Sequence, residues 1–100
     1  MNLEVGLTSG AADLTIQGEI YVSPVAKGQQ PIVPDVKAAA GKVSAFALPS
    51  GKYEYKYHVS GGVGAFTVSI DDTGTGRHIA REDEDTKFGF SGKGLPFEVP

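Results

Sequence analysis

Alternation of hydrophobic and polar residues runs through much of the chain and is clearest between residues 13 and 23. The apolar side of this segment comprises Leu14, Ile16, Gly18, Ile20 and Val22. A period of two predicts a half-buried β-strand over 14–23, which Pro24 ends. Gly18, inside this run, predicts a bulge or a close approach of another backbone.

Two further alternating segments flank the dipeptide Gly61-Gly62. Residues 52–60 place three tyrosines on one side, and residues 64–71 alternate in the same way. A glycine pair accepts the positive φ angles of a two-residue turn, so the sequence predicts a hairpin near residues 52–71. In that register Tyr57 faces Phe66, Tyr55 faces Val68, and Tyr53 faces Ile70. Such pairing favours the tyrosine stripe as core over an exposed binding platform for sugars or partners.

The remaining segments are shorter. The proline-containing stretch around 24–34 is typical of a loop. Asp35 before an alanine run predicts a short helical turn near 35–40, which Gly41 ends; a helix continuing to Leu48 is the competing interpretation. The predicted strands cover 14–23, 42–48, 52–60, 64–71, 77–81, 86–91 and 95–99.

About seven strands at this spacing predict one all-β domain over residues 1–100. We expect a small antiparallel β-sandwich of immunoglobulin-like or jelly-roll type, with a small β-barrel as the alternative. Fourteen glycines and six prolines fit sheets joined by tight turns. The chain has no cysteine, which excludes disulfides and thiolate metal sites.

The segment Leu48-Pro49-Ser50-Gly51-Lys52-Tyr53-Glu54-Tyr55, followed by Val59, Gly61 and the alternation of Phe66, Val68 and Ile70, carries a resemblance. It is similar to the penultimate hairpin of secreted bacterial β-sandwich modules, such as immunoglobulin-like and prepeptidase C-terminal domains. Those modules commonly end with this hairpin, whereas about thirty residues follow it here. The resemblance covers under a quarter of the chain and implies an accessory or adhesive module.

The formal net charge of −3 comes from the acidic segment 71–87, which holds six acids and three bases. Elsewhere the basic residues are scattered singly, so neither nucleic acid nor an anionic membrane surface is expected as a partner. No run approaches the roughly 20 apolar residues that cross a bilayer, so membrane insertion is not expected. The first ten residues show no signal peptide, and the compartment stays open.

The acids of this segment partly imitate a calcium-binding loop. Asp71, Thr73, Thr75 and Gly76, with Glu82 at the twelfth place, follow the EF-hand spacing, but threonines occupy two ligand positions. The favoured interpretation is a solvated loop that limits association between sheet edges. In that case no cofactor is expected. The alternative is a looser calcium site on the acidic 71–85 loop, formed by Asp71, Asp72, Glu82, Asp83 and Asp85.

Signatures of catalysis are missing from the sequence. Two histidines and no cysteine supply neither a three-histidine zinc site nor a cysteine nucleophile, and no phosphate-binding loop is present. We therefore expect a non-enzymatic module that binds a protein or a glycan through a sheet face or the loops around 24–34 and 71–86. With the tyrosines buried, the available surface is the polar side of the hairpin: Glu54, Lys56, His58, Thr67 and Ser69. The alternative is a homo-oligomeric structural subunit that self-assembles through edge strands or through Phe88, Phe90 and Phe97.

Overall fold

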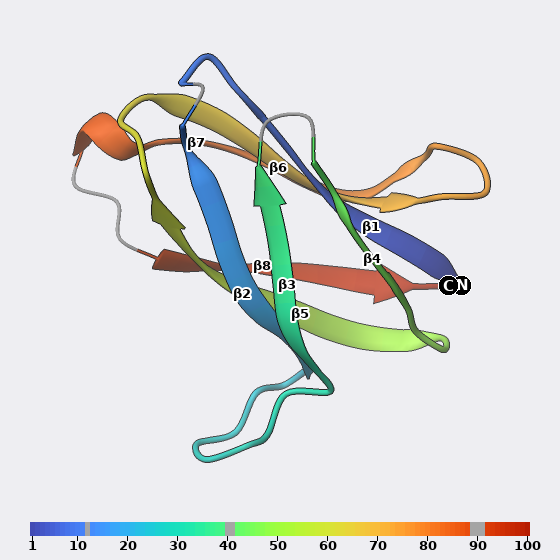
Figure 1. The fold of residues 1–100 in the computed structure, drawn as a ribbon. Coiled ribbons are helices and arrows are strands. Elements are labelled where there is room, and N and C mark those ends of the chain that lie inside the picture. The colour runs from blue at the N-terminus through green and yellow to red at the C-terminus, as the bar shows by residue number, and fades with distance from the viewer. Residues whose placement is uncertain (12, 40–41, 89–91) are drawn as a thin grey trace.

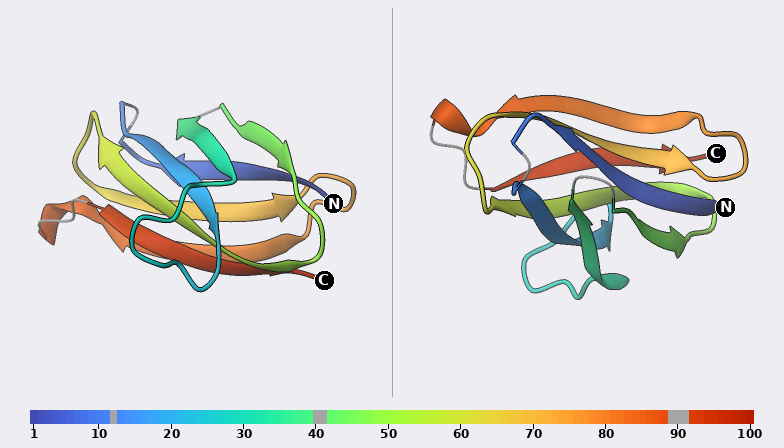
Figure 2. Two further views of the ribbon diagram at one scale, coloured as in Figure 1. Left: turned by 90° about the horizontal axis from the view of Figure 1, so that it is seen from below. Right: turned by 45° about the horizontal axis from the view of Figure 1, so that its top comes forward.

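The computed structural model describes residues 1–11, 13–39, 42–88 and 92–100, and it contains two packed antiparallel sheets (Figure 1, Figure 2). The elements are β1 (Asn2–Ser9), β2 (Thr15–Val22), β3 (Val33–Ala39), β4 (Ser44–Ala47), β5 (Gly51–Ser60), β6 (Ala65–Asp72), β7 (His78–Asp85), the 3-10 turn η1 (Thr86–Phe88) and β8 (Gly92–Val99). One sheet has the strand order β4-β1-β6-β7, and the other has the order β3-β2-β5-β8. The predicted all-β sandwich is confirmed, and the described strands do not close into a barrel. No helix among the described residues has the length and apolarity needed to cross a membrane.

The predicted hairpin over residues 52–71 is wrong, because β5 and β6 belong to different sheets. β5 pairs with β2 and β8, whereas β6 pairs with β1 and β7. Gly61 and Gly62 instead carry the chain from one sheet to the other. At Gly61 φ is 82°, and a Cβ would lie 2.2 Å from the carbonyl oxygen of Asp13. Tyr57 still meets Phe66, but across the core, with the rings edge to face and their centroids 6.5 Å apart.

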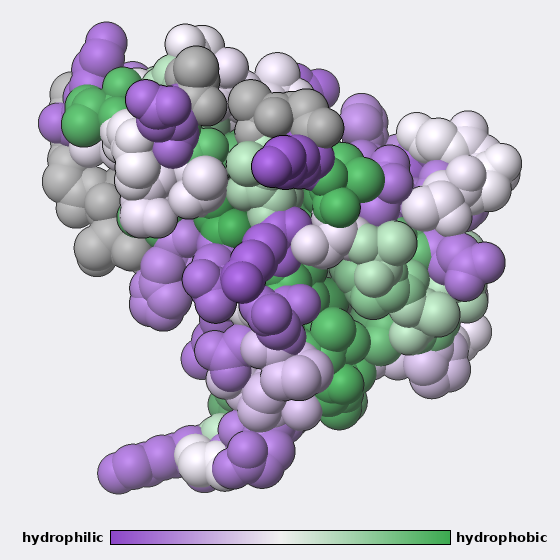
Figure 3. Space-filling model, in the orientation of Figure 1, coloured by the Kyte–Doolittle hydropathy of each residue, from purple (hydrophilic) through white to green (hydrophobic). Residues whose placement is uncertain are grey.

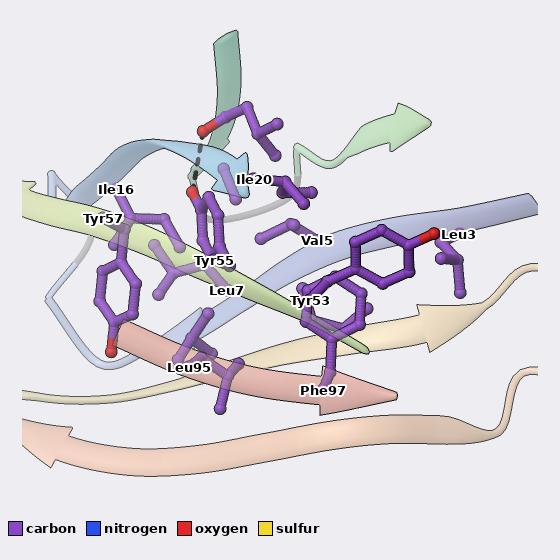
Figure 4. Packing of buried hydrophobic residues seen from close by; sticks show 14 of the residues in the cluster. Leu3, Val5, Leu7, Ile16, Ile20, Tyr53, Tyr55, Tyr57, Leu95 and Phe97 are labelled. Carbon is purple, nitrogen blue, oxygen red and sulfur yellow. Dashed lines mark hydrogen bonds between the residues drawn. The ribbon is translucent and has the colours of Figure 1, made fainter. Parts of the chain in front are cut away.

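The tyrosine stripe of β5 lies between the two sheets, as the alternation predicts. Tyr53, Tyr55 and Tyr57 are at most 4% exposed. The Tyr55 hydroxyl donates to the carbonyl oxygen of Val36 at 2.8 Å (Figure 4), and the Tyr53 hydroxyl donates to that of Pro49 at 2.7 Å. A buried phenol needs such a partner for its polar end. The stripe is therefore core, and it cannot serve as an exposed platform.

No strand is predicted from the sequence over residues 2–9, yet β1 occupies an inner position of its sheet. It pairs with β4 on one side and with β6 on the other. Leu3, Val5 and Leu7 alternate with more exposed residues and are buried in the core. β1 therefore supplies a full row of apolar side chains opposite the tyrosine-bearing sheet.

The predicted helical turn near 35–40 is also wrong over its described part. Residues 33–39 form β3, which pairs with β2 and places Val36 and Ala38 in the core. Cross-strand pairing and burial outweigh the helix propensity of alanine, which is a weak preference in comparison. Ala40 and Gly41, where this turn was expected to end, lie outside the described residues.

A side chain links the two sheets at the corner between β3 and β4. The Ser44 hydroxyl accepts a hydrogen bond from the Lys37 backbone N–H at 3.0 Å and donates one to the Lys37 carbonyl oxygen. Ser44 belongs to the sheet opposite β3, where it pairs with Val5 of β1. This hydroxyl therefore satisfies edge groups of β3 from a residue that belongs to the other layer.

Three predicted boundaries near the C-terminal end change. Residues 86–88, predicted as strand, form η1, and residues 89–91 lie outside the described part of the chain. The strand predicted over 77–81 continues to residue 85, so the four consecutive acids belong to β7 and not to a loop. β8 begins at Gly92, ahead of the predicted start at Leu95.

Gly18 has both properties predicted for it. The register of β2 against β3 shifts between Gly18 and Ile20, which marks an irregularity in the ladder. A Cβ at Gly18 would lie 2.0 Å from the Lys56 carbonyl oxygen and 2.7 Å from the Tyr57 Cα. Because both atoms belong to the backbone of β5, no side-chain rotation can relieve the contact.

We therefore expect Gly18→Ala to lower the free energy of unfolding by about 1–3 kcal/mol or more, as overpacking against backbone does. Urea denaturation measures the effect. Gly10→Ala is the matched control, since a Cβ there meets no atom within 4 Å. Equal stability of the two variants would show that β5 retreats from Gly18 at little cost.

A second prediction concerns Tyr55, whose pKa is raised above the ordinary 10.0, chiefly by burial and further by Tyr57 and Asp35. Below pH 10 the phenol is protonated in both states, and its contribution to stability is fully present. As the pH rises above 10, the unfolded chain loses this proton first, so stability falls. Denaturation between about pH 9 and about pH 11 should show a shallower decline for Tyr55→Phe than for the wild type; parallel curves would contradict the assignment.

Candidate binding surface

The five residues predicted as one partner surface lie on opposite sides of the sandwich. Glu54, Lys56 and His58 alternate with the buried tyrosines and occupy the outer face of β5. Thr67 and Ser69 occupy the outer face of β6, in the other sheet. Their expected cross-strand pairing is wrong for the same reason as the hairpin, and the two groups form separate surfaces.

On the outer face of β2 and β5, charged and polar side chains contact one another. The Tyr21 hydroxyl donates to Glu19 at 3.1 Å, and the Lys56 ammonium lies 4.0 Å from Glu54 and 5.7 Å from the centre of the Tyr21 ring. His58 borders a shallow hollow of about 190 Å³ beside Gly18. Because the positive and negative charges on this face balance, its electrostatic attraction for a charged partner is weak.

The outer face of the other sheet has a regular arrangement across three strands, which we call the β1–β6–β7 face. Its residues form three rows that run across β1, β6 and β7: Glu4, Asp71 and His78; Gly6, Ser69 and Arg81; and Thr8, Thr67 and Asp83. Within these rows the inner strands carry mainly short side chains, and β7 carries the longer imidazole and guanidinium groups. The surface is therefore low over β1 and β6, which we call the floor, and raised along β7, which we call the wall.

A chain of hydrogen bonds runs through the first two rows. The Ser69 hydroxyl donates to Asp71 Oδ2 at 3.0 Å, and His78 Nδ1 donates to Asp71 Oδ1. Ser69 is only 9% exposed and the Asp71 side chain 16%, although both belong to the outer face. The carboxylate stands between hydroxyl and imidazole, whereas nucleophilic catalysis needs the imidazole next to the hydroxyl. The arrangement fixes orientation and does not activate Ser69.

Gly6 leaves the space that the Ser69 and Asp71 side chains occupy. A Cβ at Gly6 would lie 3.2 Å from Ser69 Oγ, which is tight packing against the hydroxyl. Two shallow hollows, of about 230 and 290 Å³, follow the floor and share Thr8 and Thr67 in their lining. The first is walled by His78 and Arg81. Together they form a continuous trough parallel to the strands.

The acidic residues predicted to bind calcium are dispersed over the hairpin of β6 and β7. Asp72 shapes the turn, where it accepts hydrogen bonds from the Gly74 N–H and the Thr75 hydroxyl, both close to 3 Å. Along β7, Glu82 is opposite the buried Val68, so it points to the inner side, while Asp83 points outward. Asp85 lies at the far end, opposite Ala65, and Asp71 at the near end. Within the described ranges, no three such side chains are grouped as metal ligands.

We therefore expect millimolar calcium to leave the melting temperature unchanged, because alternate side-chain directions along β7 prevent the convergence of carboxylates that calcium needs. Thermal unfolding with calcium and with a chelator, at equal ionic strength, measures this. A calcium-specific rise in melting temperature that Asp83→Asn abolishes would contradict it.

Several residues of the β1–β6–β7 face were not predicted as functional. Gly6 and Thr8 were missed together with β1, and Arg81 was predicted only as the end of the strand over 77–81 in the acidic segment. The signal was the alternation of Leu3, Val5 and Leu7, which places Gly6 and Thr8 on the opposite side of a strand. Comparison of the chain with protein-family models, with curated proteins and with solved structures finds no match.

Proposed function

We propose that this chain is a non-enzymatic module that binds a protein through its β1–β6–β7 face. The observation that carries the proposal is the trough built over Ser69, a hydroxyl nearly buried on an outward-facing surface. Hydrogen bonds among Ser69, Asp71 and His78 hold these polar side chains in fixed orientations on this face. Preorganised polar groups in a hollow give a binding site its specificity.

The opposite outer face is a weaker candidate. On it the Tyr21 hydroxyl is bonded to Glu19 and the Lys56 ammonium lies over the Tyr21 ring, so these polar groups already have partners. The loop between β2 and β3 projects beyond the sandwich and is hydrophilic along most of its length (Figure 3). The Gln29 side chain holds this loop through hydrogen bonds with the Ala26 N–H and the Val22 carbonyl oxygen.

A protein is a better-supported partner than a glycan. Sugar recognition commonly uses exposed aromatic rings as stacking platforms, and the three tyrosines that favoured a glycan are in the core. The β1–β6–β7 face instead combines hydroxyls with charges of both signs. Charges of both signs favour a partner with complementary charges, which polypeptides carry and neutral sugars lack.

The self-assembly alternative has less support. Phe97, one of its proposed contacts, is 6% exposed and stacks on Tyr53 with ring centroids 5.6 Å apart. The side chain of Phe88 and the whole of Phe90 lie outside what the structure describes. Among the described edges, β4 has four residues, β3 and β8 contain Pro34 and Pro96, and β7 carries consecutive acids. Short strands, prolines and charges all oppose edge-to-edge pairing.

The test compares two matched variants in capture from an extract of the source cells. Thr8→Arg fills the trough, and Gln17→Arg places the same side chain on the opposite outer face. Both positions are exposed on strands, so equal melting temperatures should confirm that each variant folds. We expect the wild type and Gln17→Arg to capture the same protein in equal amounts. Thr8→Arg should capture at least about tenfold less of it.

Equal capture by both variants would place the binding surface elsewhere. Binding of the wild type to a glycan on an array, lost in Thr8→Arg and without any captured protein, would show that the partner is a glycan and not a protein. Light scattering across a concentration range accompanies the test, and a mass of one chain is expected throughout.

A further inference from the structure

The charges of the β1–β6–β7 face alternate in sign from row to row. The first row holds the Glu4 carboxylate and Asp71, which is 16% exposed and bonded to His78; the second holds the Arg81 guanidinium, and the third holds Asp83. Arg81 and Asp83 lie 3.7 Å apart, with side chains 57% and 72% exposed, and Asp83 also accepts a hydrogen bond from the Thr67 hydroxyl at 2.6 Å. An ion pair this exposed contributes little by itself, so both charges remain accessible to a partner.

The spacing of the rows is that of an extended polypeptide. Successive outward residues of a strand are roughly 6.6 Å apart, and the side chains on one side of any extended peptide repeat at the same distance. A peptide that lies along the trough, parallel to the strands, would therefore place its residues i, i+2 and i+4 over the three rows. The short side chains of Thr8, Thr67 and Ser69, which line the hollows, leave room for its backbone.

From this register we infer that the trough binds an extended peptide segment with basic residues at i and i+4 and an acidic residue at i+2. This inference rests on the proposed function and names the chemistry of its partner. The basic side chains meet the acids of the first and third rows, and the acidic one meets Arg81. The pattern reads the same in both chain directions, so it does not depend on whether the peptide runs parallel or antiparallel to β6.

Sign matters more than total charge in this arrangement. The three rows hold the three acids Glu4, Asp71 and Asp83 against the single arginine, so any cationic peptide gains some attraction. A peptide with three basic residues would place its middle one against Arg81, and like charges held together across an interface oppose binding. Alternation therefore provides selectivity that simple electrostatic attraction lacks.

Two labelled peptides test the inference by fluorescence anisotropy: Thr-Lys-Thr-Asp-Thr-Lys-Thr and Thr-Lys-Thr-Lys-Thr-Lys-Thr. We expect the wild-type chain to bind the first about tenfold more tightly than the second. In Arg81→Glu the preference should reverse, because the second row becomes acidic. Lys56→Glu, an equal change of charge on the opposite outer face, should leave the wild-type preference in place.

The outcomes separate the inference from the proposed function. Equal binding of both peptides, or a preference that Arg81→Glu does not reverse, would overturn the charge register. Binding of neither peptide would also overturn it, while capture of a protein that depends on Thr8 would leave the proposed function standing. Failure of capture with Thr8 intact would overturn the proposed function itself.

Discussion

The burial of the β5 tyrosine stripe between the sheets is the constraint on which the rest of the structure depends. Three phenol rings must be covered on both sides, and the hydroxyl groups of Tyr53 and Tyr55 must reach backbone partners. β2 and β8 flank them in the plane of the sheet, and β1 and β6 face them from the other layer. Tyr55 reaches the backbone of β3, and Tyr53 reaches the β4–β5 connection. With this side of both sheets filled, polar residues remain for the two outer faces.

Alternation predicts which side of a strand is buried but not what lies opposite it. Tyr57 and Phe66 are in contact in either arrangement, whether their strands pair in a hairpin or face each other across a sandwich. Gly61-Gly62 permits both as well, because positive φ serves a tight turn and a crossing between layers equally. The buried residues of β5 and β6 were therefore predictable, and their sheet partners were not. The same ambiguity placed Glu54 and Thr67 on one surface, when they lie on opposite sides.

Other differences have local causes. The alanines of β3 favour a helix by intrinsic propensity, and only pairing with β2 and burial of Ala38 make them a strand. The acids of β7 look like a loop because charge usually marks solvent, yet an edge strand tolerates charge and benefits from it. β1 was predictable from Leu3, Val5 and Leu7. Without β1, the rows that define the β1–β6–β7 face could not be assembled, so the candidate site depended on a strand that was overlooked.

The Ser44 hydroxyl, which joins β3 to a residue of the opposite sheet, also fixes one long margin of the sandwich. At the margin formed by β3 and β4, two hydrogen bonds and a short chain connection link the layers. At the opposite margin β7 and β8 are in contact. Separating the layers at β3 and β4 would break both Ser44 hydrogen bonds, so this edge resists the entry of water to the core.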